Sequence, residues 1–299
     1  MTNKPILSIC IPTYNRKYYL KKLLNNIFSQ KINTDSFEVV ISDNDSNDWT
    51  DKMVNLFLKK YDNIVYIKNN TNLWCDKNIL NVVKSAKWKY CWLFWDDDII
   101  IDWSIQHILD IVLDNIKNNI WLFFLNYISN DKPIIRSITH DFFSKNAYIY
   151  MDYIINRIKK HEMDPLKFTF LSSLIINKDS RDNTKNKEKY IWTWLLHTYT
   201  ILDFILSSPI YFVSKPLLIQ NNAPYRWDVS ISKEYLVAKA WIKIYILFSK
   251  IFSKHRWYFY KLILFHYIEY IYNKYFSNFK IFKYLLGLFK KFFSSYFYK

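Results

Sequence analysis

Residues 90–98 of the chain read YCWLFWDDD, an apolar run followed closely by three consecutive aspartates. The run from Tyr90 to Phe94 is short and bulky, which is typical of a buried strand. Three adjacent carboxylates at the end of such a strand repel one another, so a cation or hydrogen bonds must compensate for their charge. Mg²⁺ and Mn²⁺ prefer carboxylate oxygens, usually together with substrate phosphates. We therefore interpret Asp96–Asp98 as a candidate metal site; the alternative is a solvated acidic turn or a helix N-terminus.

The part of the chain before this run alternates between strand patterns and helix patterns. Apolar runs predict strands at residues 6–11, 37–41 and 64–67. Apolar residues recur at helical spacing between these strands and the run at residue 90. Strands that alternate with helices predict βαβ units and a mainly parallel sheet, which binds ligands at the carboxyl ends of its strands. The predicted helices cover residues 18–28, 53–58 and 78–86.

Polar side chains come directly after several predicted strands, so we expect them to converge on one edge of the sheet. Asp43 is one of them, and a carboxylate at that place can accept a ring N–H from a nucleotide base. An Asx-turn explains Asp43 equally well, because aspartate favours turns. The other polar residues expected at this edge are Asn15, Arg16 and Asp96–Asp98.

The pattern is looser after Asp98. Strands are predicted at 121–127, 168–177 and 211–219, the last interrupted by Pro216. A charged loop is predicted over 178–189, and a helix that contains His197 over 192–206. We expect an α/β domain over residues 1–230 and a helical C-terminal extension over 231–299.

The chain has 299 residues and a net charge of +16, concentrated near the C-terminus. From Lys233 onward lysines alternate with large apolar residues, which favours helices lying on an anionic membrane surface. A helical subdomain packed on the core is an equal alternative, and nucleic-acid binding lacks a recognisable motif. No stretch reaches the ~18 apolar residues that a membrane-spanning helix needs. Three cysteines without metal-ligand spacing and an N-terminus without a signal peptide favour the cytoplasm.

The chain contains a single glycine, Gly287, and twelve tryptophans. Roughly twenty glycines would be expected at this length. Four of the tryptophans lie where turns are expected and would give ordinary turn sequences if they were glycine. We hypothesise that most tryptophans represent UGA codons that the source organism decodes as glycine; the alternative is a chain rich in real tryptophan, with Trp92 the best candidate. The four turn-like positions are Trp49, Trp74, Trp88 and Trp95.

Four motifs in residues 5–105 together resemble a family 2 glycosyltransferase. They are LSICIPTYNR at 7–16, ISDNDSND at 41–48 with Thr50, Asn72–Leu73 with Asn78, and Trp92–Leu93 followed by Asp96–Asp98. This family has glycine at the four turn-like tryptophan positions, which independently supports the recoding hypothesis. The resemblance implies a GT-A fold, a nucleotide-diphosphate sugar donor and a Mn²⁺ or Mg²⁺ ion.

The resemblance also implies roles for single residues. Asp43 would recognise the base, Arg16 would lie near the phosphates, and Asp97 near the ribose or sugar. Asp98 would bind the metal, with Asp96 as a further candidate ligand of this DXD motif. His197 is one candidate for the catalytic base or for a metal contact, although a lone histidine on an apolar helix is more often a packed core residue. Glu188 and Asp203 are weaker options for the base. The remaining residues of the implied donor site are Pro12, Thr13, Asn15, Asn72 and Asn78.

The function expected from these motifs is inverting transfer of a sugar to a glycan or lipid-linked acceptor. We expect a role in surface polysaccharide synthesis, at the inner face of the cell membrane. Two other interpretations stay open: a sugar nucleotidyltransferase, and a non-enzymatic module that binds lipid or nucleic acid. A nucleotidyltransferase would be expected to carry a glycine-rich N-terminal phosphate loop with a lysine, and residues 12–16 provide neither.

Overall fold

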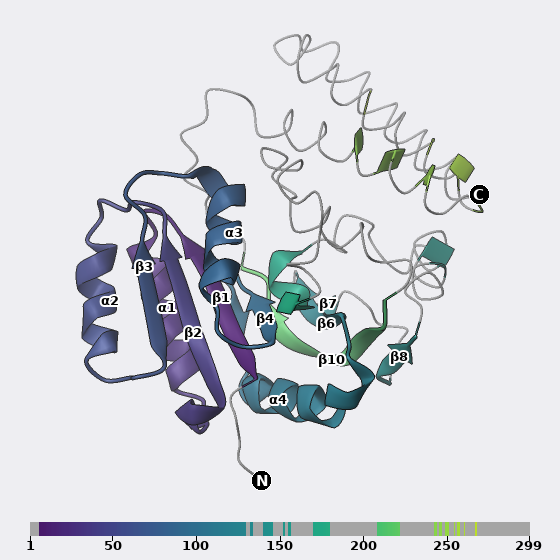
Figure 1. The fold of residues 1–299 in the computed structure, drawn as a ribbon, viewed down its shortest axis with the longest axis horizontal. Helices are drawn as coiled ribbons and strands as arrows, with labels where there is room; N and C mark the ends of the chain where they lie inside the picture. The colour runs from purple at the N-terminus through teal and green to yellow at the C-terminus, as the bar shows by residue number, and fades with distance from the viewer. Residues whose placement is uncertain are drawn as a thin grey trace.

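The N-terminal half of the protein is a parallel α/β unit, as predicted. In the computed structural model, residues 6–129, 132–133, 140–145, 170–179 and 208–221 are described, with single positions between 152 and 267. Four strands pair in parallel in the order β3-β2-β1-β4, with helices between them (Figure 1). The elements are β1 (Leu7–Thr13), α1 (Lys17–Phe28), β2 (Phe37–Asp43), α2 (Thr50–Leu58), β3 (Ile64–Lys68), α3 (Trp74–Ser85) and β4 (Tyr90–Leu93).

The sheet continues beyond β4 as a mixed sheet. Its full order is β3-β2-β1-β4-β9-β6-β10-β5, with β7 on β6 and β8 on β10. Strand β9 runs antiparallel to both of its neighbours, β4 and β6, whereas β6 and β10 are parallel to each other. The later elements are β5 (Ile99–Ile100), α4 (Ser104–Asp114), β6 (Leu122–Ser129), β7 (Lys132–Pro133), β8 (Phe142–Ser144), β9 (Leu174–Asn177) and β10 (Ile210–Ile219).

Two features of this second half differ from the sequence-based expectation, and a third agrees with it. Helix α4 was not predicted, although its buried residues recur at helical spacing. The strand expected at 168–177 is shorter, because a 3-10 helix at Leu171–Ser173 precedes β9. The interruption expected at Pro216 is present as a register shift between Val213 and Leu218 in the pairing of β10 with β6, which fits the missing N–H of proline.

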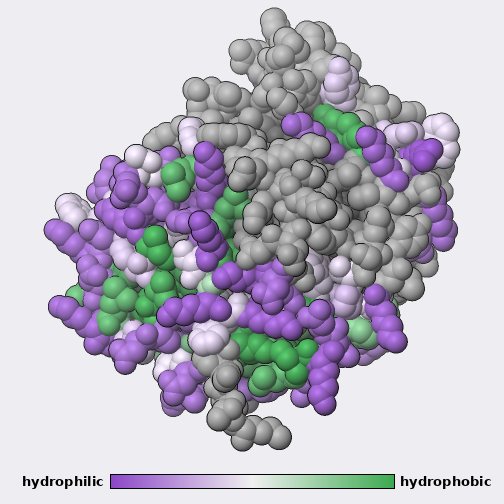
Figure 2. Space-filling view, in the orientation of Figure 1, coloured by the Kyte–Doolittle hydropathy of each residue, from purple (hydrophilic) through white to green (hydrophobic). Residues whose placement is uncertain are grey.

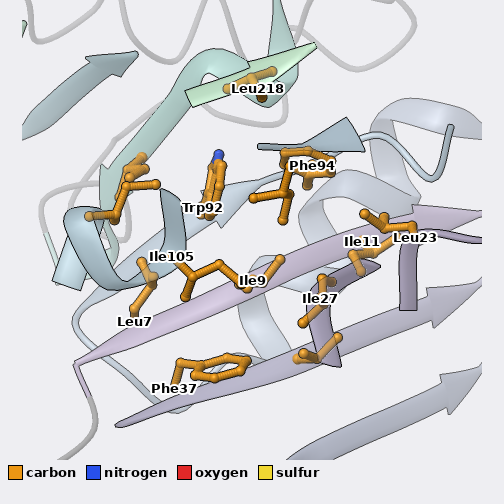
Figure 3. Close-up of a cluster of buried hydrophobic side chains, with 14 of the residues drawn as sticks. Leu7, Ile9, Ile11, Leu23, Ile27, Phe37, Trp92, Phe94, Ile105 and Leu218 are labelled. Atoms are coloured by element: carbon orange, nitrogen blue, oxygen red, sulfur yellow. The ribbon is translucent and has the colours of Figure 1, made fainter. Parts of the chain in front are cut away.

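The core lies on one face of the sheet. In β1 the alternate residues Leu7, Ile9 and Ile11 join a buried cluster with side chains of α1, α2 and α4 (Figure 3). Helix α3 packs on β1 and β2, and its buried residues Ile79, Val82 and Val83 lie outside that cluster, which places α3 on the opposite face. Two helical layers therefore cover the sheet, as a GT-A fold requires.

The described surface of the N-terminal half is largely hydrophilic, with small apolar patches (Figure 2). Among the described residues, no helix is long and apolar enough to cross a membrane. The predicted helix over 192–206, the domain boundary at residue 230 and most of the basic C-terminal extension lie outside the described residues. Predictions about them stay predictions.

Candidate donor site

The carboxyl ends of β1, β2 and β4 form one polar edge of the sheet. Thr13 at the end of β1 is paired with Asp43 at the end of β2, and the amide of Asn44 donates to the carbonyl of Thr13 at 2.9 Å. Asp96–Asp98 follow β4 by a few residues. The predicted convergence of these residues is therefore confirmed by the geometry.

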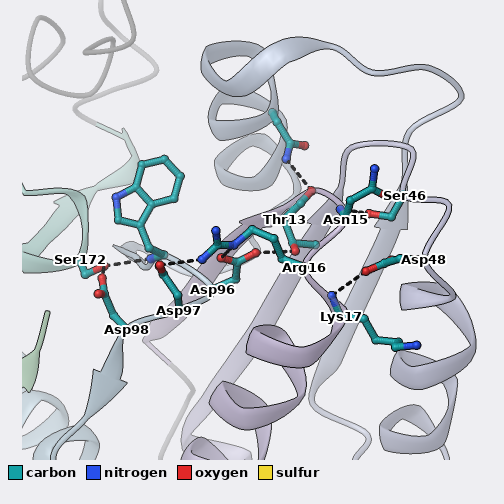
Figure 4. A network of polar contacts seen from close by, with 12 residues as sticks. Thr13, Asn15, Arg16, Lys17, Ser46, Asp48, Asp96, Asp97, Asp98 and Ser172 are labelled. Carbon is teal, nitrogen blue, oxygen red and sulfur yellow. Dashed lines mark hydrogen bonds and ion pairs between the residues drawn. The ribbon is translucent and has the colours of Figure 1, made fainter. Parts of the chain in front are cut away.

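Asp96 and Asp97 face the loop that follows β1 (Figure 4). The hydroxyl of Thr13 donates to Asp96 Oδ2 at 2.6 Å. Arg16 Nε lies 2.8 Å from Asp96 Oδ1, and Arg16 Nη2 lies 2.6 Å from Asp97 Oδ2. One guanidinium thus spans two carboxylates.

Asp98 points away from this pair and is held by the second half of the sheet (Figure 4). Its Oδ2 accepts a short hydrogen bond from the hydroxyl of Ser172, and its Oδ1 accepts from the amide of Asn221 at 3.0 Å. Ser172 is fully buried; its hydroxyl also accepts from the amide of Trp95, and its carbonyl accepts from Trp92 Nε1. Ser172 is a site residue for which no role was predicted from the sequence.

All three carboxyl groups are buried, and burial disfavours their charged forms. Burial raises the pKa of Asp96 to about 6, with Arg16 opposing and the charge of Asp97 adding to the rise. Burial also raises the pKa of Asp97, and raises that of Asp98 well above its usual range. A site with this surplus of buried carboxylate favours the arrival of a cation.

The residues fit a metal ion that is shared with a substrate, and do not fit a closed metal site made by the protein alone. Within the described ranges, no three His, Cys, Asp or Glu side chains are arranged to hold a metal. Asp96 and Asp98 diverge from each other, as their separate partners show. Mg²⁺ commonly takes only one or two carboxylates and completes its shell with phosphate oxygens and water.

A network of asparagine amides occupies the neighbouring part of the edge. Asn78 accepts from the hydroxyl of Ser42 at 2.7 Å and donates to the carbonyls of Ser42 and Thr13. Asn72 accepts from the side chain of Asn44 at 2.7 Å. Asn72 and Asn78 therefore lie where the resemblance implies, and the sequence did not single out the partners that complete the network: Asn44, Asn69 and Asn81.

Asp43 has both of its carboxylate oxygens engaged by the protein. Oδ1 accepts from the amide of Ser46 at 2.8 Å, and Oδ2 accepts from the hydroxyl of Tyr66 at 2.6 Å. The first contact stabilises the turn after β2, in agreement with the Asx-turn interpretation. Base recognition by Asp43 stays a prediction, and it requires a base N–H to share or replace the contact with Tyr66.

The loop after β1 is fixed by contacts to the loop after β2. Asn15 has a left-handed backbone with φ 52°, its amide donates to the hydroxyl of Ser46, and its side chain accepts from the amide of Asn47. Asp48 accepts from the amide of Lys17 at the start of α1. Pro12 lies inside β1, opposite Ser42, and His197 lies outside the described residues.

Residues 8–176 match the protein family described as Glycosyl transferase family 2. The chain belongs to this family. The match covers all four motifs that carried the resemblance, apart from Leu7, and extends into β9, which confirms the family that the sequence predicted.

Individual relatives agree with this assignment. The chain is 34% identical over 226 residues to the abequosyltransferase RfbV of Salmonella typhimurium, covering 72% of this chain and 66% of that protein. It resembles S. aureus TarS 1-349 in complex with UDP-GlcNAc, with a TM-score of 0.60, 14% identity and coverage of 89% and 72%. It also resembles the mannosyltransferase PcManGT of Pyrobaculum calidifontis in complex with GDP-Man and Mn²⁺, with a TM-score of 0.53, 12% identity and coverage of 84% and 65%. These structures show the fold that the chain shares.

Proposed function

We propose that this protein is a metal-dependent, inverting glycosyltransferase that moves a sugar from a nucleotide-diphosphate donor to a glycan or lipid-linked acceptor. The observation that carries the proposal is the meeting of Thr13, Arg16, Asp43 and Asp96–Asp98 at the carboxyl edge of the sheet. This edge combines the guanidinium of Arg16, hydrogen-bond donors and buried carboxylates. A sugar diphosphate bridged by a divalent ion needs this combination.

Different residues at this edge would bind different parts of the nucleotide-sugar donor. Asp43 and the asparagine network lie on the side where a base would be bound, and Arg16 offers its planar guanidinium to the diphosphate. Asp98 and Asp96 would hold the ion, and Asp97 would lie toward the ribose or the sugar. When bound, Mn²⁺ or Mg²⁺ would offset the negative charge that develops on the leaving diphosphate.

Inversion requires a base on the acceptor side to take a proton from the attacking hydroxyl. His197 stays the candidate for that role. The names of the relatives support sugar transfer in surface polysaccharide synthesis, since one is an abequosyltransferase. The basic residues after Lys233 favour attachment to the inner face of the membrane, where a lipid-linked acceptor would be available.

Calorimetry with nucleoside diphosphates tests the proposal. UDP, GDP and CDP are each titrated into the full chain with Mn²⁺ present, and at least one is expected to bind. Asp98→Asn should weaken that binding at least about tenfold, because it removes a charged candidate ligand of the ion. Asp110→Asn is the matched control, since Asp110 is exposed on α4 and accepts a hydrogen bond from the side chain of Gln106. Absence of binding by all three nucleotides, or equal binding by the Asp98→Asn variant, would contradict the proposal.

A further inference from the structure

Arg16 is placed as the counter-cation of two buried carboxylates. Its side chain is only 14% exposed, it contacts Asp96 and Asp97 at 2.8 and 2.6 Å, and its guanidinium lies 4.6 Å from the ring centroid of Tyr19. Asp96 and Asp97 are 3% and 8% exposed. Without a nearby cation, these two carboxylates would repel each other in a poorly solvated place.

We propose that Arg16 and the divalent ion act in exchange at this site, so that the donor diphosphate controls access to the acidic residues. This inference rests on the proposed function. Without a donor, Arg16 neutralises Asp96 and Asp97 and opposes a second cation beside them. The donor diphosphate offers the guanidinium an alternative bidentate acceptor. Binding of the donor then frees Asp96, the second candidate ligand of the ion beside Asp98.

If Arg16 and the ion exchange in this way, removing Arg16 should strengthen Mn²⁺ binding, although the loss of a site residue usually weakens binding. Removing Arg16 removes a competing positive charge and leaves two buried carboxylates uncompensated. The affinity for Mn²⁺ alone should therefore rise, while the affinity for the nucleotide should fall. A residue that merely held the loop in place would weaken both kinds of binding when it was removed.

The experiment measures binding of Mn²⁺ alone, by electron paramagnetic resonance, to the full chain and to three variants. Arg16→Gln should bind Mn²⁺ about tenfold more tightly, a size usual for coupling between sites. Arg16→Lys keeps the charge and should stay within about twofold of the unchanged protein. Lys22→Gln is the matched control, because Lys22 is an exposed cation on the same helix that lies over the ring of Tyr18. Unchanged or weaker Mn²⁺ binding by Arg16→Gln would overturn the inference.

A measurement on the unchanged protein covers the case in which Arg16→Gln does not fold. The Nε–H signal of Arg16 is assigned in a nitrogen-15 NMR spectrum by its loss in Arg16→Lys. It should shift when Mg²⁺ and a nucleoside diphosphate are added together, and stay in place with Mg²⁺ alone. A signal that does not move when the nucleotide binds would show that Arg16 stays bound to Asp96 and Asp97, and would overturn the inference. Failure of every nucleotide to bind would instead contradict the proposed function itself.

A second inference comes from the backbone of three tryptophans. Trp49, Trp74 and Trp103 have φ angles of 63°, 67° and 76°, in the left-handed region. Their side chains are 62%, 47% and 80% exposed, so no burial of the indole offsets the strain. For a bulky residue such a conformation is an outlier, whereas glycine adopts it without a steric penalty.

All three tryptophans lie at the start of a helix. Trp49 and Trp103 immediately precede α2 and α4, and Trp74 is the first residue of α3. In each place the chain must turn sharply into the helix. Trp88 and Trp95, which the sequence also marked as turn-like, are not among the described residues with positive φ. The backbone therefore supports recoding at two of the four marked positions, Trp49 and Trp74, and adds Trp103.

We infer that the protein made in its own organism carries glycine at positions 49, 74 and 103. Trp92 provides the contrast. It is fully buried, its indole N–H donates to the carbonyl of Ser172 at 2.8 Å, and its ring lies edge-on to Phe94. Its contacts are those of a real tryptophan.

Peptide mass spectrometry of the protein isolated from its source organism tests this inference directly. Glycine is expected at the three positions, and tryptophan at all three would overturn it. Thermal unfolding of recombinant protein gives a second test: the combined change Trp49→Gly, Trp74→Gly and Trp103→Gly should raise the Tm by a few degrees. Trp92→Gly is the matched control and should lower the Tm by about 10 °C or more. A fall of similar size in the triple variant would also contradict the inference.

Discussion

The two halves of the sheet hold the acidic residues in different ways. On the parallel side, Asp96 is bound by Thr13, the last residue of β1, and both Asp96 and Asp97 are bound by Arg16 in the loop after β1. On the mixed side, Asp98 is bound by Ser172 and Asn221, which are 74 and 123 positions away in the chain. The parallel side supplies charge, whereas the mixed side supplies neutral hydrogen-bond donors. This difference indicates that Asp96 and Asp97 are already compensated, and that Asp98 is the carboxylate with most to gain from an added cation.

The largest expected effect is a loss of sugar transfer when the charge of Asp98 is removed, which the surface residue Asp110 should not share. Asp98→Asn should reduce sugar transfer at least about 100-fold, because the charge that holds the ion is lost while the side-chain shape is kept. The rate of transfer from the nucleotide sugar identified by calorimetry is the measurement. Asp110→Asn should leave the rate within about twofold. An equal loss in both variants would show that Asp98 has no special role.

The next effect tests the hydrogen bond from Ser172 to Asp98 in the mixed half of the sheet. Ser172→Ala should lower the transfer rate about 10-fold or more, because Asp98 loses the hydroxyl that orients it. The free energy of unfolding should also fall by about 1–3 kcal/mol, since the amide of Trp95 loses its partner. Ser173→Ala is the control, as the Ser173 hydroxyl donates to the carbonyl of Phe170. If Ser173→Ala lowered the transfer rate as much, orientation of Asp98 would not be the cause.

A third effect concerns pH and the parallel side. Burial raises the pKa of Asp96 from its ordinary value of 3.8 to about 6, so the folded protein binds a proton more readily than the unfolded chain. This contribution to stability is present below pH 4 and is lost as the pH rises through 6. In metal-free buffer, Asp96→Asn should therefore flatten the decline in unfolding free energy between pH 4 and 6, by about 2 kcal/mol. Chemical denaturation at several pH values measures this, and parallel curves for both proteins would show that Asp96 does not titrate there.

The smallest effect concerns Asp43. Tyr66→Phe removes the donor to Asp43 Oδ2 and should lower the free energy of unfolding by about 1 kcal/mol. If Asp43 also recognises the base, freeing this oxygen should leave nucleotide affinity unchanged or improve it. Calorimetry on the variant decides between these roles, because a large loss of affinity would mean that the Tyr66 contact itself is needed for binding.

The parallel half of the fold could be predicted closely from the sequence. Apolar runs and helical spacing locate β1, α1 and β2 to within a few residues, because each element is continuous in sequence and buries one simple face. The convergence of Arg16 and Asp96 then follows from the rule that parallel strands end at a common edge.

The rest of the site could not be predicted in this way. Ser172 and Asn221 reach Asp98 only because β9 and β10 join the sheet out of sequence order, and no local pattern encodes that order. Asn69 and Asn81 gave no signal either, since a single asparagine in a loop or helix does not indicate which partners it will meet. Helix α4 does carry a helical pattern, but Trp103 at its N-cap is not one of the residues that usually signal the start of a helix.

Crystallography of the full chain with Mn²⁺ and the nucleoside diphosphate that binds most tightly tests the central claim most directly. Anomalous scattering locates the ion without reference to any assumed ligand. One Mn²⁺ peak is expected at the carboxyl edge, in contact with Asp98 and the diphosphate, with Arg16 moved from Asp97 to the diphosphate. A nucleotide bound elsewhere, or an ion that does not touch Asp96–Asp98, would contradict it.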